Sequence, residues 1–217
     1  MKLFKDTKKL VLLGVLSALG SIFMLIEIPY PPVPFLKFDI SDLPVLLTAQ
    51  ALGLWPAIFV SVIKSLISLM VRGMNSPMGI GLITAAISSI ALAYLYVSIK
   101  KYVSGTKWYE KVIRFVGIIF TYSVFMTICN YVFITPIYLG GLWFTDVADW
   151  VTLEAFIPNL TFSFFNLSFT IPNFGYGATI AFIYMPFNSL KGFFILSIYE
   201  AISSRLLPEL KKILKNS

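Results

Sequence analysis

Residues 1–28, MKLFKDTKKLVLLGVLSALGSIFMLIEI, indicate the fold class of this chain. A basic start with four lysines precedes a predominantly apolar run from Leu10 to Ile28. A helix that crosses the hydrocarbon core of a membrane needs about 20 apolar residues, so this run is long enough to span. A basic start before an apolar run is also typical of a signal peptide. The run is long for that role and lacks a small-x-small cleavage site before Pro29, so a membrane span is favoured.

The composition of the whole chain also favours a membrane protein. Of the 217 residues, 58% are hydrophobic and 12% are charged, whereas soluble domains carry about 45–50% apolar and about 25% charged residues. The chain has no histidine and one cysteine, which excludes a His/Cys metal centre, a His-assisted nucleophile and an internal disulfide. It also has no G-x-x-x-x-G-K-[ST] loop, so ATP hydrolysis would have to come from another chain. The net charge of +7 fits lysines and arginines held in cytoplasmic loops, and no nucleic-acid partner is expected.

Further apolar segments predict six spans in total, at residues 10–28, 43–53, 56–71, 78–99, 113–138 and 177–207. The sequence Gly53-Leu54-Trp55-Pro56 predicts a tight turn, with Pro56 as the first residue of a new helix. Pro186 interrupts the last span. One solution begins the last helix at Pro186, which would place Asn188 and Lys191 in its first turns near the outer surface.

The basic residues orient these spans. Thirteen of the 17 lysines and arginines lie in three segments: the N-terminus, the connection at 98–116 and the C-terminus. The 139–176 loop contains acidic residues and no lysine or arginine. The chain has no internal repeat or polar linker, which predicts a single all-α membrane domain over residues 1–217, and the positive-inside rule predicts its orientation. In this bundle of six transmembrane helices both termini are cytoplasmic, and loops 29–42 and 139–176 lie outside.

The first outer loop, from Glu27 to Leu43, has four prolines, which restrict its backbone. Polar and apolar residues alternate from residue 36 to 43, so that Lys37, Asp39 and Ser41 are expected to share one side. This pattern favours a short ordered lid or plug. A plain connecting loop is the alternative.

The polar residues within the predicted spans include Lys64, Asn130, Asn188 and Lys191. Polar side chains inside a membrane are costly and usually face the bundle interior, where they either bind a ligand or join helices. Asn188 and Lys191, three residues apart, share one helix face. The glycine-containing stretch 79–84 begins a helix at the same level, and its glycines would let a ligand approach the backbone. An apolar pocket with a few amides and a lysine suits a flat aromatic ligand with a polyol or amide tail.

These residues also carry a resemblance to a known family. The segments concerned are LKFDISDLP at 36–44, Lys64, Asn130-Tyr131 and YMPFNSLKG at 184–192, of which Pro-Phe-Asn-x-x-Lys-Gly is the most specific. The chain resembles the substrate-binding S components of energy-coupling-factor (ECF) vitamin transporters, and among them most closely those for riboflavin. The resemblance covers most of the chain and is weakest at 139–176.

The resemblance implies a six-helix protein of the cell membrane, in bacteria the plasma membrane, that binds riboflavin from outside and has no enzymatic activity of its own. Asn130, Asn188 and Lys191 match positions that contact the flavin. The other expected ligand-binding residues lie near them in the lid, the spans or the 79–84 stretch: Phe35, Asp39, Ser41, Lys64, Gly79, Leu82 and Tyr184. No cofactor or metal is expected, although Lys37 and Lys191 are compatible with riboflavin phosphate (FMN) as well as riboflavin.

The resemblance also implies partners, namely a transmembrane T component and two cytoplasmic ATPases. In the family a pair of alanines four residues apart on the first helix contacts the T component, and Gly14 and Ala18 occupy the corresponding positions here. Such small-x-x-x-small pairs are common in membrane helices.

Three alternatives stay open at this point. The first is an S component for another vitamin, such as pantothenate or a thiamine-like compound, although a thiamine-type cation should favour carboxylates and stacked tryptophans. A membrane scaffold without a ligand is the second. An intramembrane enzyme is the third; the predicted topology places Glu27 and Glu200 too far apart to act as an acid–base pair.

Overall fold

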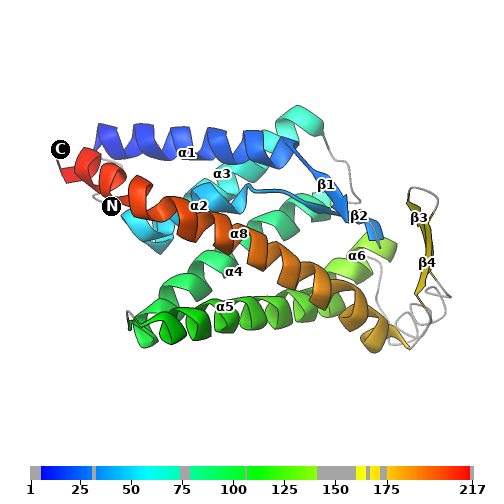
Figure 1. Ribbon diagram of the computed structural model, residues 1–217. Coiled ribbons are helices and arrows are strands. Elements are labelled where there is room, and N and C mark those ends of the chain that lie inside the picture. Colours follow the sequence, from blue (N-terminus) through cyan, green and yellow to red (C-terminus); the bar gives the residue numbers. More distant parts are fainter. Residues whose placement is uncertain are drawn as a thin grey trace.

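The computed structural model describes residues 6–30, 33–73, 79–105, 107–140, 160–164, 167–171 and 175–215. The chain forms a helical bundle with two short β-hairpins at one end (Figure 1). The elements are α1 (Thr7–Leu25), β1 (Ile28–Tyr30), β2 (Val33–Phe38), α2 (Asp42–Leu52), α3 (Leu54–Arg72), α4 (Ile80–Tyr102), α5 (Trp108–Cys129), η3 (Asn130–Ile134), α6 (Thr135–Gly140), β3 (Leu160–Phe164), β4 (Leu167–Ile171) and α8 (Tyr176–Lys215).

Five helices of the described residues are long and apolar enough to cross a membrane. They are α1, α3, α4, the continuous α5–η3–α6 segment and α8. The remaining predicted span, 43–53, corresponds to α2, which has only 11 residues. At 1.5 Å per residue it is about 16 Å long, roughly half of the hydrocarbon core.

The segment before α2 explains why this helix can be short. Strands β1 and β2 pair as an antiparallel hairpin, with Ile28 opposite Phe38. After β2 the chain continues into the bundle, where Ser41 and Asp42 are almost completely buried. The hairpin and the residues after it therefore occupy the part of the bundle's length that α2 does not reach, and α2 begins in the interior, among the other helices.

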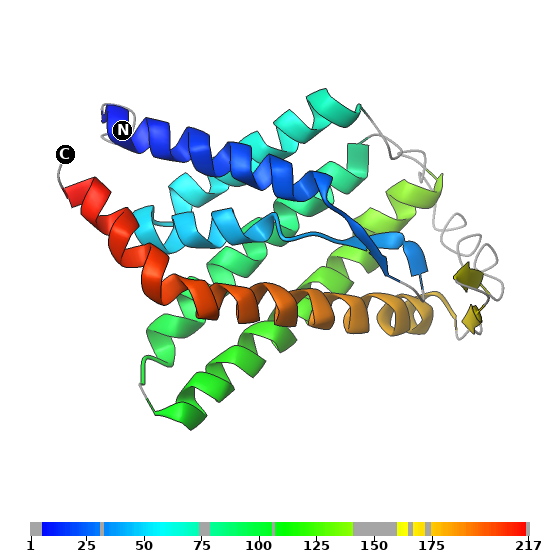
Figure 2. The same ribbon diagram turned by 45° about the horizontal axis from the view of Figure 1, so that its top comes forward.

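The two ends of the bundle differ. Both termini and the connection from α4 to α5 lie at one end, called here the terminal end, and the hairpins lie at the opposite hairpin end (Figures 1 and 2). The three segments rich in lysine and arginine thus share the terminal end, as the six-span topology requires. The core between the ends is built of apolar side chains from all the long helices, among them Leu13, Leu46, Val60, Leu92, Ile118 and Leu196.

The close approach of α1 to α3 depends on a glycine. A Cβ at Gly20 would lie 3.2 Å from Cδ and 3.3 Å from Cβ of Lys64. The missing side chain therefore leaves room for the aliphatic stem of a lysine that is completely buried.

Several sequence-based boundaries change. The first helix is Thr7–Leu25 and the residues after it enter β1, so its predicted end at residue 28 was too late. The turn between α2 and α3 is made by Gly53 alone, with φ of 98°, so Pro56 is the third residue of its helix and not the first. The single glycine reverses the chain because it adopts a positive φ that other residues avoid.

The largest change concerns the last helix. α8 runs without interruption from Tyr176 to Lys215 and contains both Pro186 and Pro208. Pro186 therefore does not begin a helix. At 1.5 Å per residue Asn188 lies about 18 Å along α8 from Tyr176, deep in the bundle instead of in the first turn.

Candidate ligand-binding cavity

A cavity of about 410 Å³ opens at the hairpin end of the bundle. It lies within the range of 300–1,000 Å³, roughly, that is typical of small-molecule sites. Most of its wall is apolar. Its lining comes from the ends of α1 and α3, the hairpin and the segment after it, the start of α4, the α5–η3 segment and the middle of α8. The lining residues are Met24, Glu27, Leu36, Lys37, Asp39, Arg72, Gly73, Ile80, Gly81, Leu82, Thr84, Ala85, Ser88, Met126, Asn130, Ile134, Tyr184, Phe187, Asn188 and Lys191.

Two amides lie in the cavity wall. Asn188 is buried on α8, and among the described residues its Nδ2 has no hydrogen-bond partner. Leaving a buried amide donor unpaired costs about 1–3 kcal/mol, so a free donor beside a cavity points to a ligand acceptor. Asn130 is also buried, and its Nδ2 donates to the Met126 carbonyl at 2.7 Å.

Asn130 begins a short π-helical turn. Its own carbonyl accepts a hydrogen bond from the amide of Thr135, five residues later. π-Turns inside α-helices are rare and frequently occur at functional sites. Asn130 and Ile134, four residues apart, both line the cavity.

An ionic cluster closes the deep side of the cavity. The Lys64 Nζ lies 3.1 Å from Asp42 Oδ1 and donates to the hydroxyls of Ser41, at 2.8 Å, and Ser89, at 2.6 Å. The Lys191 Nζ lies 3.1 Å from Asp42 Oδ2 and 3.6 Å from Asp39 Oδ2. Two lysines and two aspartates thus balance each other inside the bundle, as buried charges require.

A second ionic group lies at the cavity mouth. The carboxylate of Glu27, near the end of α1, accepts hydrogen bonds from both Arg72 and Lys37, the latter at 2.7 Å. Arg72 also donates to the Met24 carbonyl at 2.5 Å. This group ties the hairpin to the ends of α1 and α3.

Aromatic rings hold the other side of the hairpin against α8. The rings of Phe38 and Phe187 lie 4.8 Å apart, and Tyr30 contacts both. Aromatic pairs at these separations add to the stability gained from burial. The hairpin is therefore an ordered cover for the cavity.

Six of the ten predicted ligand-binding residues line the cavity: Asp39, Leu82, Asn130, Tyr184, Asn188 and Lys191. Lys64 and Ser41 lie behind it in the ionic cluster, so the structure does not place either in the wall. Gly79 is the N-cap of α4, next to the lining residue Ile80. The side chain of Phe35 lies outside the described residues.

Sequence reasoning missed several residues of the cavity and its surroundings. Arg72 was not considered, and Glu27 was noted only as the start of the first outer loop and as a distant partner of Glu200. The pairing of Glu27 with Arg72 across α1 and α3 has no sequence signal. Asp42 lies in the 36–44 segment that carries the family resemblance, but its place at the centre of the ionic cluster was not predicted. Its position directly before Leu43-Pro44, in a segment rich in charges, was the available signal.

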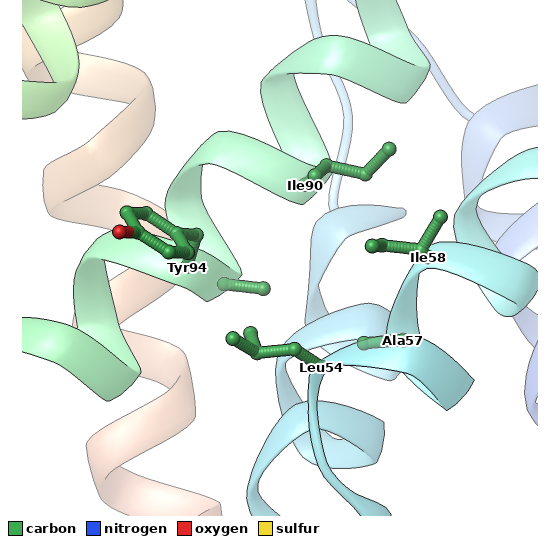
Figure 3. Close-up of a pocket in the computed structure, with 6 residues that line it drawn as sticks. Leu54, Ala57, Ile58, Ile90 and Tyr94 are labelled. Atoms are coloured by element: carbon green, nitrogen blue, oxygen red, sulfur yellow. The ribbon is translucent and has the colours of Figure 1, made fainter.

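A second, smaller hollow lies between α3 and α4 and has a different character. It measures about 90 Å³ and is lined by Leu54, Ala57, Ile58, Ile90, Ala93 and Tyr94. Figure 3 shows the hydroxyl of Tyr94 pointing away from Ala57 and Ile58. Without a polar group directed into it, this hollow offers no means of orienting a ligand.

The predicted contact with a T component depends on Gly14 and Ala18 of α1. Both residues are exposed, together with Val11 and Val15. A Cβ at Gly14 would meet no atom within 4 Å. The two small residues thus form part of a smooth apolar strip that the rest of the described chain leaves uncovered.

Comparison with known proteins identifies the family. Similar curated proteins include a riboflavin transporter FmnP of Bacillus subtilis, 26% identical over 202 residues that cover 93% of each chain. Another is a riboflavin transporter RibU of Streptococcus thermophilus, 28% identical over 190 residues that cover 85% of each chain.

A solved structure titled as the S component of a bacterial ECF transporter has the same fold. It superposes with a TM-score of 0.65 at 20% identity, covering 94% of this chain and 98% of that one. The family model for the substrate-specific component of ECF transporters matches residues 8–203. The chain therefore belongs to the family of ECF transporter substrate-specific components, as its sequence motifs predicted.

Proposed function

We propose that this protein is the riboflavin-binding subunit of an ECF importer. The observation that carries the proposal is the cavity itself, where Asn130, Asn188 and Lys191 converge from two helices on an otherwise apolar space. Two relatives that align over most of their length are named riboflavin transporters, which supports the same ligand.

The chemistry of riboflavin suits this lining. Its three-ring system is flat and largely apolar, and one edge carries carbonyl and nitrogen acceptors. The free Nδ2 donor of Asn188 and the ammonium of Lys191 complement those acceptors. The hydroxyls of the ribityl chain would find charged partners toward the mouth, at Glu27, Lys37 and Arg72.

The charges of the lining favour a neutral or anionic ligand over a cation. Lys37, Arg72 and Lys191 outnumber Glu27 and Asp39 among the lining residues. A thiamine-like cation would meet an excess of positive charge, whereas riboflavin would not. Riboflavin phosphate fits this balance as well.

The proposed route is capture from outside the bacterial plasma membrane and delivery inward. The hairpin end, where the cavity opens, would face outward, and the basic terminal end would face the cytoplasm. A T component would contact the strip around Gly14 and Ala18, where small residues allow close helix approach. Two ATPases bound through that component would supply the energy.

The visible absorption spectrum and flavin fluorescence of the purified protein test the ligand. We expect riboflavin to bind with strong fluorescence quenching, and Asn188→Ala to weaken binding about 10-fold, the value of one hydrogen bond lost to a buried amide. Gln50→Ala is the matched control, because it removes an amide that pairs with Lys100, away from the cavity lining. Equal affinities of Asn188→Ala and wild type would contradict the proposed site. Binding of a different vitamin would contradict the ligand alone.

A further inference from the structure

We propose that Asp42 is a positioning residue for ligand binding, because it fixes the ammonium of Lys191 at the cavity wall. This inference rests on the proposed function, in which Lys191 contacts the flavin. Asp42 itself does not line the cavity and is almost completely buried at the start of α2.

The two carboxylate oxygens of Asp42 serve different helices. Oδ1 accepts hydrogen bonds from Lys64 on α3 and Ser89 on α4. Oδ2 lies 3.1 Å from the Lys191 Nζ on α8, and among the described residues it has no hydrogen-bond partner. The first oxygen therefore anchors the carboxylate to the bundle, and the second presents a fixed charge to Lys191.

Lys191 needs such an anchor. A lysine side chain has four rotatable bonds and carries its charge as a point at the end of a flexible stem. Its other carboxylate neighbour, Asp39, is 3.6 Å away and belongs to the segment that follows β2. Without Asp42 the ammonium would shift toward Asp39 and the hairpin. It would then leave the position from which it donates to a ligand.

Asp42 thus affects affinity only through Lys191, and this distinguishes positioning from a general structural role. If Asp42 acts by holding Lys191, replacing it has no further effect on binding once Lys191 is gone. If Asp42 only stabilises the bundle, its replacement weakens binding equally with or without Lys191. A double-mutant cycle measures this difference directly.

The experiment titrates riboflavin into four purified proteins: wild type, Asp42→Asn, Lys191→Met and the double variant. We expect Asp42→Asn to weaken riboflavin binding about 10-fold in the wild-type background and less than about 2-fold in the Lys191→Met background. Glu200→Gln is the matched control. It changes a carboxylate that accepts from Tyr96 outside the cavity lining and should bind as wild type does.

Asp42→Asn leaves Lys64 without its carboxylate partner and could prevent folding. The cycle is then repeated with the joint replacement Asp42→Asn/Lys64→Met in place of Asp42→Asn alone, so that both partners of the buried pair are removed together. Unchanged affinity of Asp42→Asn, or an equal loss in both Lys191 backgrounds, would overturn the positioning role. If wild type binds no flavin, the proposed function is overturned and this inference with it; if Lys191→Met binds flavin as tightly as wild type, this inference alone is overturned.

Discussion

Lys64 and Lys191 contact the same carboxylate from opposite sides, yet their surroundings differ. The side chains of Lys64 and Asp42 are 0% and 1% exposed, whereas those of Lys191 and Asp39 are 8% and 11% exposed. The first pair is enclosed by helices, and the second borders the cavity. One ionic cluster therefore has a dry side, which should govern stability, and a side open to ligand and water, which should govern binding.

The largest expected effect is on the dry side. Lys64→Met leaves a buried Asp42 oxygen with only the Ser89 hydroxyl, and breaking a buried pair in this way costs about 3–5 kcal/mol. We expect a large loss of thermal stability in detergent, measured by tryptophan fluorescence. The comparison would fail if Lys64→Met were as stable as wild type.

The next effect is on the open side. Lys191→Met should weaken riboflavin binding by about 10- to 100-fold, because a hydrogen bond from a charged group contributes about 1.5–3 kcal/mol. Its loss of stability should be smaller than that of Lys64→Met, since Asp39 can be hydrated through the cavity. Fluorescence titration and thermal unfolding of both variants measure the contrast, and identical profiles would refute it.

A smaller change sharpens the comparison at the dry side. Gly20→Ala places a Cβ 3.2 Å from the stem of Lys64 and should cost about 1 kcal/mol, the low end of overpacking. Gly14→Ala, on the same helix, meets no neighbour and is the matched control. Thermal unfolding should separate the two. A Gly20→Ala protein as stable as Gly14→Ala would show that the Lys64 stem adjusts without strain.

The smallest effect is expected at the mouth. Glu27→Gln removes the negative charge shared by Lys37 and Arg72, but this group is partly exposed, and such pairs contribute about 0–1 kcal/mol. Riboflavin affinity should fall less than about 5-fold. The difference from wild type should shrink as salt is raised, because screening weakens exposed pairs. An effect as large as that of Lys191→Met would move the centre of the site to the mouth.

The sequence was informative wherever a local pattern had a single physical meaning. Apolar length predicted the membrane helices, and the distribution of basic residues predicted that the termini share one end. The element Pro-Phe-Asn-x-x-Lys-Gly placed Asn188 and Lys191 on one helix face, and both line the cavity. These properties depend on residues close together in the chain.

Prediction was weaker where the outcome depended on competing packing. Pro186 was a reasonable helix start, because proline lacks an amide hydrogen. In the bundle, α8 instead packs along α5, and the helix continues past Pro186. Similarly, Lys64 matched a ligand-binding residue by type and depth, but its rotation on α3 directs it to Asp42.

The sequence by itself determined a membrane protein of apolar helices, its family and the polar residues that the membrane makes costly. Only the tertiary structure decided which of those residues face the cavity and which balance one another. The physical reason is that a buried charge must find a partner, and the partner is chosen by distances between helices. Asp42, Lys64 and Lys191 lie far apart in sequence, so their arrangement exists only once α2, α3 and α8 have packed.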